Sequence, residues 1–434
     1  MSGTEPTLAY VLGTFPGITE TFIIRELQSL RERGFEVLVC AVRRSDLPDV
    51  ERSLISEELL HNTLYARPDR VSRHLWANVR AFLRSPFRYL DVLGVFMREA
   101  PNLKPYDIGR VLFHFYCGIG FIEELRERKV RHLHAHFVAG SNMALAAHLY
   151  DGISFSFTAH ASGDIYRNAI LIEKKMERAA LVLPVCDYNL RYLDSLTGYR
   201  YGSKLRRVYN SVDVSEALRL VGSGTVSHRG DGRGGPARIL SVGSLVRMKG
   251  HATLIHACRH LRDGGYDFRC EIIGEGPERM VLERLIQDAE LVGTVTLRGA
   301  QPLREVYASM MDADIFALLS EIDVDGFRDA LPTVILEAMG QGLPVVSTWV
   351  SGIPEMVTHG TTGFLVPERD AERAADSMAA LLDDVDLRRS MGAAGTRKLH
   401  EEFNPETIAD LRFQLLDGLV GRVNLNEVPG GHAR

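Results

Sequence analysis

Two carboxylates stand eight positions apart in the C-terminal half of the chain. Asp329 comes just ahead of a predicted helix, and Glu337 falls in the second turn of that helix. The first-turn amides of Thr333 and Val334 have no partner within the helix, and the helix dipole favours a phosphate there. One carboxylate can then hold hydroxyl groups on one side of a diphosphate, and the other those on the opposite side. A nucleotide-sugar has this layout.

The two acids belong to a strand, loop, helix, strand unit of a parallel sheet. Buried strands are predicted over 313–320 and 344–348, on either side of the helix. The acidic loop 321–328 lies between the first strand and the helix. We expect this loop either to contact the acceptor or to be a solvated insertion.

The bulk composition is that of an ordinary globular protein. The chain has 434 residues, 45% hydrophobic and 25% charged, which is enough for two domains. The net charge of −5 argues against a general nucleic-acid binder. Five scattered cysteines with no CxxC pair favour buried thiols in a reducing compartment.

The start of the chain carries no basic segment followed by an apolar one, and apolar runs stay shorter than a membrane span. We therefore expect a cytoplasmic protein, with at most a peripheral hold on the inner face of the membrane.

The segment D-A-L-P-T-V-I-L-E-A resembles the acidic pair of glycosyltransferase family 4, also called glycosyl transferases group 1. Asp329 replaces the usual first glutamate, and Ala330 the usual glycine. The opening run FPGITETFIIREL is similar to members that build exopolysaccharides such as colanic acid. The resemblance implies an α/β protein of the GT-B class, with two Rossmann-like doubly wound domains facing a cleft. It also implies sugar transfer with retention, from a nucleotide-sugar such as a UDP- or GDP-sugar, with no cofactor and no metal.

The expected domain organisation follows the composition and the resemblance. A glycine-rich linker separates two α/β alternations, and in GT-B proteins the last helix crosses back to the N-terminal domain. The expected segments are the acceptor domain 1–215, the linker 216–236, the donor domain 237–400, the crossing helix 401–420 and a tail, 421–434.

Cations follow the first strand of the donor domain. The run from Gly243 to Gly250 is similar to the family's G-R-L-x-x-x-K-G, which makes Lys249 a phosphate ligand. Ser244 occupies the usual arginine position, so Arg247 is the candidate to replace that charge. Without the resemblance, both cations would more often be surface charges.

The resemblance also implies the remaining roles. The expected catalytic residues are Asp329, His160, Lys249 and Arg247. The expected donor-binding residues are Glu337, Gly17, Gly274, Gly276, Leu303, Leu331, Thr333, Val334 and Asp164. A tight turn is an equally good interpretation of Gly17 on its own.

His160 ends a predicted strand, where ligands collect in open α/β sheets. Its segment is similar to the family's T-x-H-G-x-D, which adds Asp164. Three other histidines, His132, His134 and His136, alternate along a strand, as metal ligands can. Since no acid or cysteine stands near them in the sequence, we expect neutral histidines bonded to backbone. Asp312-Ala313-Asp314 is interpreted as a strand entry and not as a metal motif.

An arginine-rich segment, 66–89, has two interpretations. On a helical projection its apolar residues share one side, while Arg73, Arg80 and Arg84 share the other. We favour a helix packed on the N-terminal sheet with a solvated basic face. The alternative is a helix that lies on an anionic membrane and meets a lipid-linked acceptor.

Three other functions compete with sugar transfer. A GT-B isomerase or phosphorylase would use the same fold, and a non-catalytic nucleotide-sugar binding protein is suggested by Asp329 and Ser244. A nicotinamide oxidoreductase would need a GxGxxG after the first strand, which is absent from the sequence. Exopolysaccharide or a lipid-linked oligosaccharide is the expected acceptor, followed by a small natural product.

Overall fold

The structure is a computed structural model that describes residues 8–16, 21–45, 55–67, 71–99, 103–161, 165–166, 169–213, 215, 221 and 235–421. The chain divides into two compact units. Unit 1 consists of Met1–Tyr209 with Glu406–Arg434, and unit 2 of Asn210–Pro405.

Unit 1 is built on a six-stranded parallel sheet with the order β3-β2-β1-β4-β5-β6. These strands are buried, as expected for a sheet covered on both faces, and most of their residues are apolar except in β4, which carries three buried histidines. The strands are β1 (Leu8–Thr14), β2 (Val37–Arg43), β3 (Thr63–Tyr65), β4 (His132–His136), β5 (Ser154–Ala159) and β6 (Leu181–Pro184).

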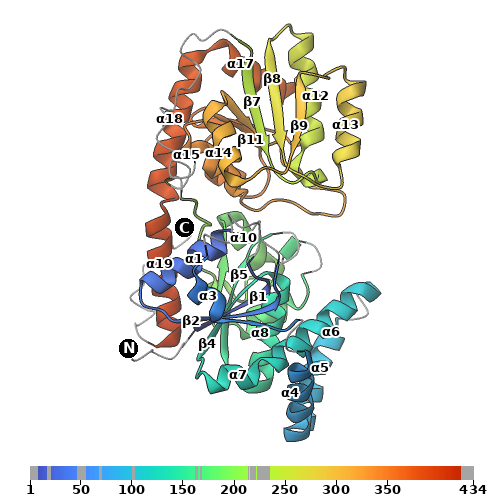
Figure 1. The fold of residues 1–434 in the computed structure, drawn as a ribbon, viewed down its shortest axis with the longest axis vertical. Helices are drawn as coiled ribbons and strands as arrows, with labels where there is room; N and C mark the ends of the chain where they lie inside the picture. The colour runs from blue at the N-terminus through green and yellow to red at the C-terminus, as the bar shows by residue number, and fades with distance from the viewer. Residues whose placement is uncertain are drawn as a thin grey trace. The chain divides into compact units, whose positions relative to one another are not determined.

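Helices cover both faces of this sheet (Figure 1). They are α1 (Thr21–Glu32), α3 (Glu57–His61), α4 (Val71–Arg84), α5 (Pro86–Met97), α6 (Pro105–Gly120), α7 (Ile122–Glu127), α8 (Phe137–Asp151), α9 (Ile172–Arg178), α10 (Asp187–Leu196) and α19 (Pro405–Val420). Helix α8 is buried almost throughout because it lies between the sheet and α6.

Unit 2 has a second six-stranded parallel sheet, with the order β12-β11-β10-β7-β8-β9. Its strands are β7 (Ala237–Val242), β8 (Phe268–Ile273), β9 (Val295–Gly299), β10 (Ile315–Ala317), β11 (Val345–Thr348) and β12 (Gly363–Val366). Its helices are α12 (His251–Asp263), α13 (Arg279–Asp288), α14 (Leu303–Asp312), α15 (Thr333–Gly340), α16 (Ile353–Met356), α17 (Ala371–Asp383) and α18 (Val385–Glu402). The predicted pair of doubly wound α/β sheets is confirmed.

Helix α19 packs beside α1 on the same face of the sheet, where Leu415 also contacts strand β6. Leu416 and Val420 join the core of unit 1, and the Phe413 ring meets that of Phe35 edge-on at 5.3 Å. Arg33 reaches across to the carboxylate of Asp410 at 2.8 Å. Helix α19 therefore belongs to the core of the first unit.

The favoured interpretation of the arginine-rich segment is wrong. Helix α4 does not pack on the sheet through its apolar side. It lies against α6 through His74, Ala77 and Asn78, which are buried, while Leu75 and Trp76 are exposed. Helices α4 and α5 lie beside α6, and α5 also packs on α8 (Figure 1).

All five cysteines are buried and free, as predicted. Within the part of the chain that the structure describes, the helices are too short or too polar to cross a bilayer.

Candidate functional site

The order of the sheet in unit 2 places a natural ligand site between β7 and β10. The chain winds away from β7 towards β9 in one direction and from β10 towards β12 in the other. The loops that follow β7 and β10 therefore separate at the carboxyl end of the sheet, which is where open α/β sheets bind ligands.

These two loops touch through backbone atoms. Gly250 adopts a φ of +65°, and a Cβ on it would lie 1.7 Å from the carbonyl oxygen of Leu319. The amide of Glu321 donates to the carbonyl of Met248 at 2.9 Å. The contact requires glycine both for its backbone angle and for space. It sets the side chain before Gly250 against the loop after β10.

That side chain is Lys249, and it meets Asp329. The Nζ atom lies 2.8 Å from Oδ1 of Asp329, and Ser320 donates its hydroxyl to Oδ2 at 3.0 Å. The two charged side chains are only 14% and 11% exposed. Two residues that were predicted separately, 80 positions apart, are thus brought into one buried pair, with both carboxylate oxygens held.

Helix α15 starts beside this pair. Its cap, Pro332, makes no side-chain hydrogen bond, which leaves the first-turn amides of Thr333 and Val334 at a helix end without a side-chain cap. Glu337 is the fifth residue of the helix and is partly buried, whereas Leu331 is buried just before it. The predicted phosphate-binding helix end and the second acid thus lie on the helix that follows Asp329 in the chain.

The loop after β8 packs directly on the backbone after β7. A Cβ on Gly274 would lie 1.9 Å from the carbonyl oxygen of Gly243, and one on Gly276 would lie 2.4 Å from that of Leu245. Side chains on these glycines would push the two loops apart. Leu303, partly buried, begins α14 after β9.

Arg247 is not part of the buried pair. It lies with Lys249 in a short 3₁₀ turn, but its side chain is 60% exposed and stands 3.9 Å from the carboxylate of Glu278. The structure thus brings one of the two predicted cations to Asp329.

Sequence reasoning missed His251 and Ser320. His251 opens α12 beneath the loop after β7 and is 3% exposed. Burial, with the charge of Lys249, lowers the pKa of His251 to about 4, so its ring is neutral at pH 7. A histidine directly after the Lys-Gly pair was the only signal in the sequence.

In unit 1, His160 stands directly after β5 and is 6% exposed. Its Nε2 lies 2.9 Å from Nδ1 of His136, and its ring stacks on Phe137 with centroids 4.4 Å apart. The two other residues predicted for this unit, Gly17 and Asp164, lie outside the described residues.

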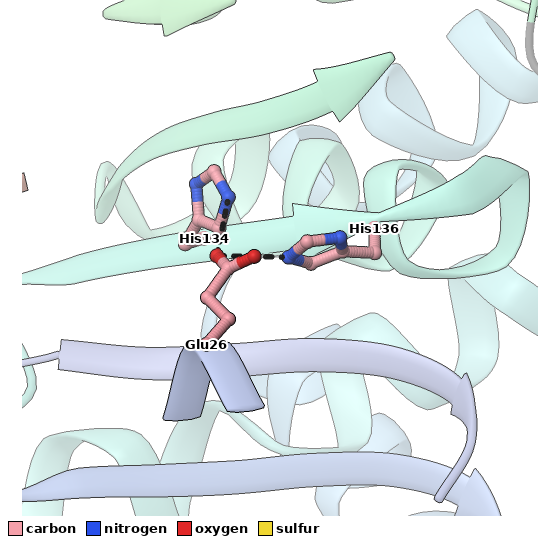
Figure 2. A group of neighbouring side chains, drawn as sticks. All are labelled: Glu26, His134 and His136. Carbon is pink, nitrogen blue, oxygen red and sulfur yellow. Dashed lines mark ion pairs between the residues drawn. The ribbon is translucent and has the colours of Figure 1, made fainter. Parts of the chain in front are cut away.

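The expectation that no acid approaches the histidines of β4 is wrong. Glu26 of α1 places its carboxylate 3.9 Å from Nε2 of His134 and 3.5 Å from Nε2 of His136, as Figure 2 shows. Arg412 of α19 lies 3.2 Å from the same carboxylate, and Tyr10 donates its hydroxyl to it. The sequence did carry a signal for this contact, because Glu26 lies on the apolar face of an amphipathic helix, between Ile23 and Leu30.

These groups are close enough to hold a metal ion, but their bonds are those of a closed polar network. His134 bonds Ser156 at 2.8 Å and Thr158 at 3.0 Å, so both ring nitrogens are engaged. The predicted backbone partners are replaced by strand hydroxyls for His132 and His134, and by the ring of His160 for His136. Arg412 already neutralises Glu26, and a cation there would disfavour a metal ion.

Burial sets the charges of this network. Burial alone would raise the pKa of the Glu26 carboxyl, but Arg412 and the two histidines hold that pKa well below its ordinary value. Burial, followed by the neighbouring His136, lowers the pKa of His160 and of His134. At pH 7 the network therefore contains one buried ion pair and neutral His134 and His160.

The carboxylate also orients protons along the chain of rings. The negative charge of Glu26 favours a proton on Nε2 of His136, the nitrogen that faces it. A proton on Nε2 leaves Nδ1 of His136 as the acceptor of the bond between the two rings, so Nε2 of His160 donates. Nδ1 of His160 consequently carries no proton and is a hydrogen-bond acceptor.

The amino ends of the strands in unit 2, opposite the Lys249–Asp329 pair, carry an ion pair and a hollow. Asp314 accepts the amide of Arg238 at 2.8 Å, and Asp312 pairs with the Arg238 guanidinium, which agrees with a strand entry. A hollow of about 770 Å³ lies at this edge, between α18 and the starts of β10 and β11. It is separate from Lys249 and Asp329, which lie at the carboxyl ends of the strands.

Comparisons with known proteins identify relatives of the chain and of its fold. The sequence model of the family described as glycosyl transferases group 1 matches residues 228–398. A protein of Salmonella typhimurium, WcaL, which is assigned to colanic acid biosynthesis as a glycosyltransferase, is 39% identical over 421 residues. The match covers 92% of this chain and 97% of WcaL.

Two solved structures share the fold. A glycosyltransferase from Rickettsia africae has a TM-score of 0.70 at 15% identity, over 97% of this chain and all of the other. HepE from Anabaena, solved with UDP, has a TM-score of 0.66 at 15% identity, over 95% of this chain and all of the other. At such identities the likeness concerns the fold, which is of the GT-B type.

Proposed function

Because the chain belongs to the glycosyl transferases group 1 family, we propose that it transfers a sugar from a nucleotide-sugar to an acceptor hydroxyl with retention of configuration. In this reaction the bond between the anomeric carbon and the diphosphate oxygen breaks. The acceptor oxygen takes the place of the diphosphate on the same face of the sugar, and the proton of the acceptor hydroxyl passes to the departing diphosphate.

The observation that carries the proposal is the buried pair of Lys249 and Asp329 beside the start of α15. Lys249 carries the charge that a leaving diphosphate needs, and the amides of Thr333 and Val334 add donors at a helix end. A preorganised set of this kind stabilises charge as it develops. Arg247, exposed at the same loop, reaches the diphosphate from solvent.

The carboxylates bind the hydroxyl groups of the donor. Glu337 binds the ribose, and Asp329 binds the transferred sugar, with Ser320 fixing the second oxygen of Asp329. His160 binds a hydroxyl of the transferred sugar, and the family pattern assigns donor binding to Asp164 and Gly17 as well. Gly274, Gly276, Leu303 and Leu331 shape the nucleotide side.

We place the donor among the UDP- and GDP-sugars and the acceptor among growing saccharides, free or lipid-linked. The relative WcaL is assigned to the biosynthesis of colanic acid, which is a polysaccharide. The structural neighbour HepE was solved with UDP. The reaction needs no metal in this proposal, because Lys249 and the helix end supply the positive potential.

The test is release of nucleoside diphosphate from a panel of UDP-, GDP-, ADP- and dTDP-sugars in EDTA, with wild type beside Glu337→Ala. Release from one donor that Glu337→Ala abolishes supports the proposal and names the donor. Release that requires a divalent metal contradicts the metal-free mechanism. A donor that binds in calorimetry, yet is neither transferred nor hydrolysed with any acceptor extract, favours the non-catalytic binding protein.

A further inference from the structure

Helices α4 and α5 present an apolar surface to solvent. Leu83 is 73% exposed, Phe87 86% and Trp76 62%. Val71, Leu75, Val79, Phe82, Leu90 and Met97 add to the same two helices, each more than a third exposed. We call this set the α4–α5 face. Single exposed apolar residues need no explanation, but nine of them on two helices that contact each other indicate a partner.

Helix α4 is seated with its polar side inward. Asn78 donates to the carbonyl of Tyr116 at 3.0 Å and accepts from the hydroxyl of Tyr89 at 3.0 Å. The His74 ring packs edge-on against Phe121 with centroids 4.6 Å apart, and it fills the space where a Cβ of Gly120 would be. These buried polar contacts fix the rotation of α4. Because His74 and Asn78 hold the inward side of α4, its apolar side faces outward.

Arginines border the α4–α5 face. Arg84 and Arg88 are exposed at the junction of the two helices, and within the described residues neither forms an ion pair with a carboxylate. Arg73 and Arg80 also lie on α4, where acids of α7 pair with them. One acid, Asp91, is exposed on α5. The free charge at the junction is thus positive.

We propose that the α4–α5 face lies on an anionic lipid bilayer. Charge complementarity selects this occupant, because a second copy of the chain packed symmetrically here would bring arginines against arginines. Trp76, Phe82 and Phe87 have the aromatic character of residues that settle at a membrane interface, and arginines beside them meet lipid phosphates. The surface goes beyond the donor chemistry and fits a transferase whose acceptor is anchored in lipid.

The experiment is vesicle flotation of the full chain, without donor. Vesicles of phosphatidylcholine alone are compared with vesicles that contain about one third phosphatidylglycerol. We expect binding to the anionic vesicles only. Trp76→Ser/Leu83→Ser/Phe87→Ser should weaken that binding at least roughly tenfold, since it removes the buried apolar area. Arg84→Gln/Arg88→Gln should weaken it roughly fivefold per arginine, the factor that about 1 kcal/mol gives.

Two controls keep the result specific. Tyr199→Ser/Val292→Ser removes equally exposed apolar residues elsewhere, 74% exposed each, and should leave binding unchanged. The chain has two tryptophans, so Trp349→Phe leaves Trp76 as the sole emitter, whose fluorescence should shift to the blue on anionic vesicles.

The contrary outcomes are distinct. Equal binding to both kinds of vesicle, or none to either, overturns the proposal. A dimer in sedimentation that the triple serine variant dissociates, without vesicle binding, assigns the surface to a second copy. Since no donor is present, failure here leaves the proposed transfer reaction intact, and failure of the donor assay leaves this result intact.

Discussion

Asp329 is the residue at which the donor site is most tightly constrained. Its two oxygens are held by Lys249 and Ser320 at 2.8 and 3.0 Å, and the residue is 9% exposed. The shorter acid fits this space, although glutamate is the usual first acid of the family 4 pattern that the segment resembles. The loop after β10 therefore has room for an aspartate side chain at this position, with both of its oxygens bonded.

Asp329→Glu should consequently lower activity and not improve it. The added methylene pushes the carboxylate past Ser320 or displaces Lys249, and a misplaced catalytic group commonly costs about a hundredfold in rate. The measurement is kcat/KM with the identified donor. Asp312→Glu, which lengthens the acid paired with Arg238 at the opposite edge of the sheet, is the matched control. Activity in Asp329→Glu equal to or above wild type would remove Asp329 from the sugar site.

A second prediction at this scale concerns the proton on His160. In protein labelled with ¹⁵N-histidine, Nδ1 of His160 should be unprotonated, because Glu26 orients His136 and His136 orients His160. Glu26→Gln can donate as well as accept, so it should give a mixture of tautomers and also destabilise unit 1 by about 3 kcal/mol through the unpaired Arg412.

Glu124→Gln is the control for that experiment. Glu124 is also buried and pairs with an arginine, Arg73, at 3.0 Å, but it lies on α7, away from the histidines. It should lose stability without changing the His160 signal. A protonated Nδ1 in wild type would refute the orientation.

At the scale of elements, the crossing of the two loops at Gly250 positions the site. Gly250→Ala adds a left-handed strain of about 1–2 kcal/mol and a clash with the carbonyl of Leu319. Gly265→Ala carries the same strain at a φ of +83° with open space around it, so it isolates the clash. We expect Gly250→Ala to lose donor turnover and more stability than Gly265→Ala, as measured by thermal unfolding and nucleotide release. Equal behaviour of the two variants would show that the loop contact is dispensable.

Individual elements were predictable where one periodicity decided them. The strands on either side of the acidic pair and the helix after Asp329 follow from apolar runs and glycines, whereas the short edge strands β3 and β12 were not predicted. Helix α4 was misplaced because an apolar stripe was assumed to face inward, whereas buried His74 and Asn78 hold the opposite side. The sequence carries the stripe, but the side that packs is decided by contacts with α6.

The contacts between elements could not be predicted in the same way. Lys249 and Asp329 were each expected at the donor, yet their direct bond depends on the order of β7 and β10 in the sheet. Glu26 meets His134 and His136 only because α1 lies over β4, and Arg412 joins them from the far end of the chain. Such contacts require the topology, which periodicity does not contain.

At the scale of the whole molecule, buried neutral histidines make the fold sensitive to acid. Burial lowers the pKa of His132 to about 3, and burial with Lys249 lowers that of His251 to about 4, from an ordinary value of 6.5. Their stability contribution is complete above 6.5 and is lost as the pH falls towards the folded pKa, because the unfolded chain then takes up protons that the folded chain refuses.

Each such histidine should cost about 2 kcal/mol of unfolding free energy between about pH 7 and about pH 5. His132→Asn keeps a partner for Ser154 and Ser156 but does not titrate, so it should reduce the loss by about that amount. Urea unfolding at the two pH values measures the difference. An identical loss in wild type and His132→Asn would mean that His132 is protonated in the folded protein.

The central claim is that Lys249, beside Asp329 and the start of α15, holds the diphosphate of the donor. The most direct measurement is nucleoside diphosphate release, with donor affinity by calorimetry, for wild type, Lys249→Met and Arg238→Met. Both substitutions remove a cation paired with a carboxylate. Lys249 lies at the carboxyl ends of the strands, and Arg238 at their amino ends. We predict that Lys249→Met loses at least about a hundredfold in turnover, while Arg238→Met keeps it. Unchanged turnover in Lys249→Met, or an equal loss in both variants, would contradict the claim.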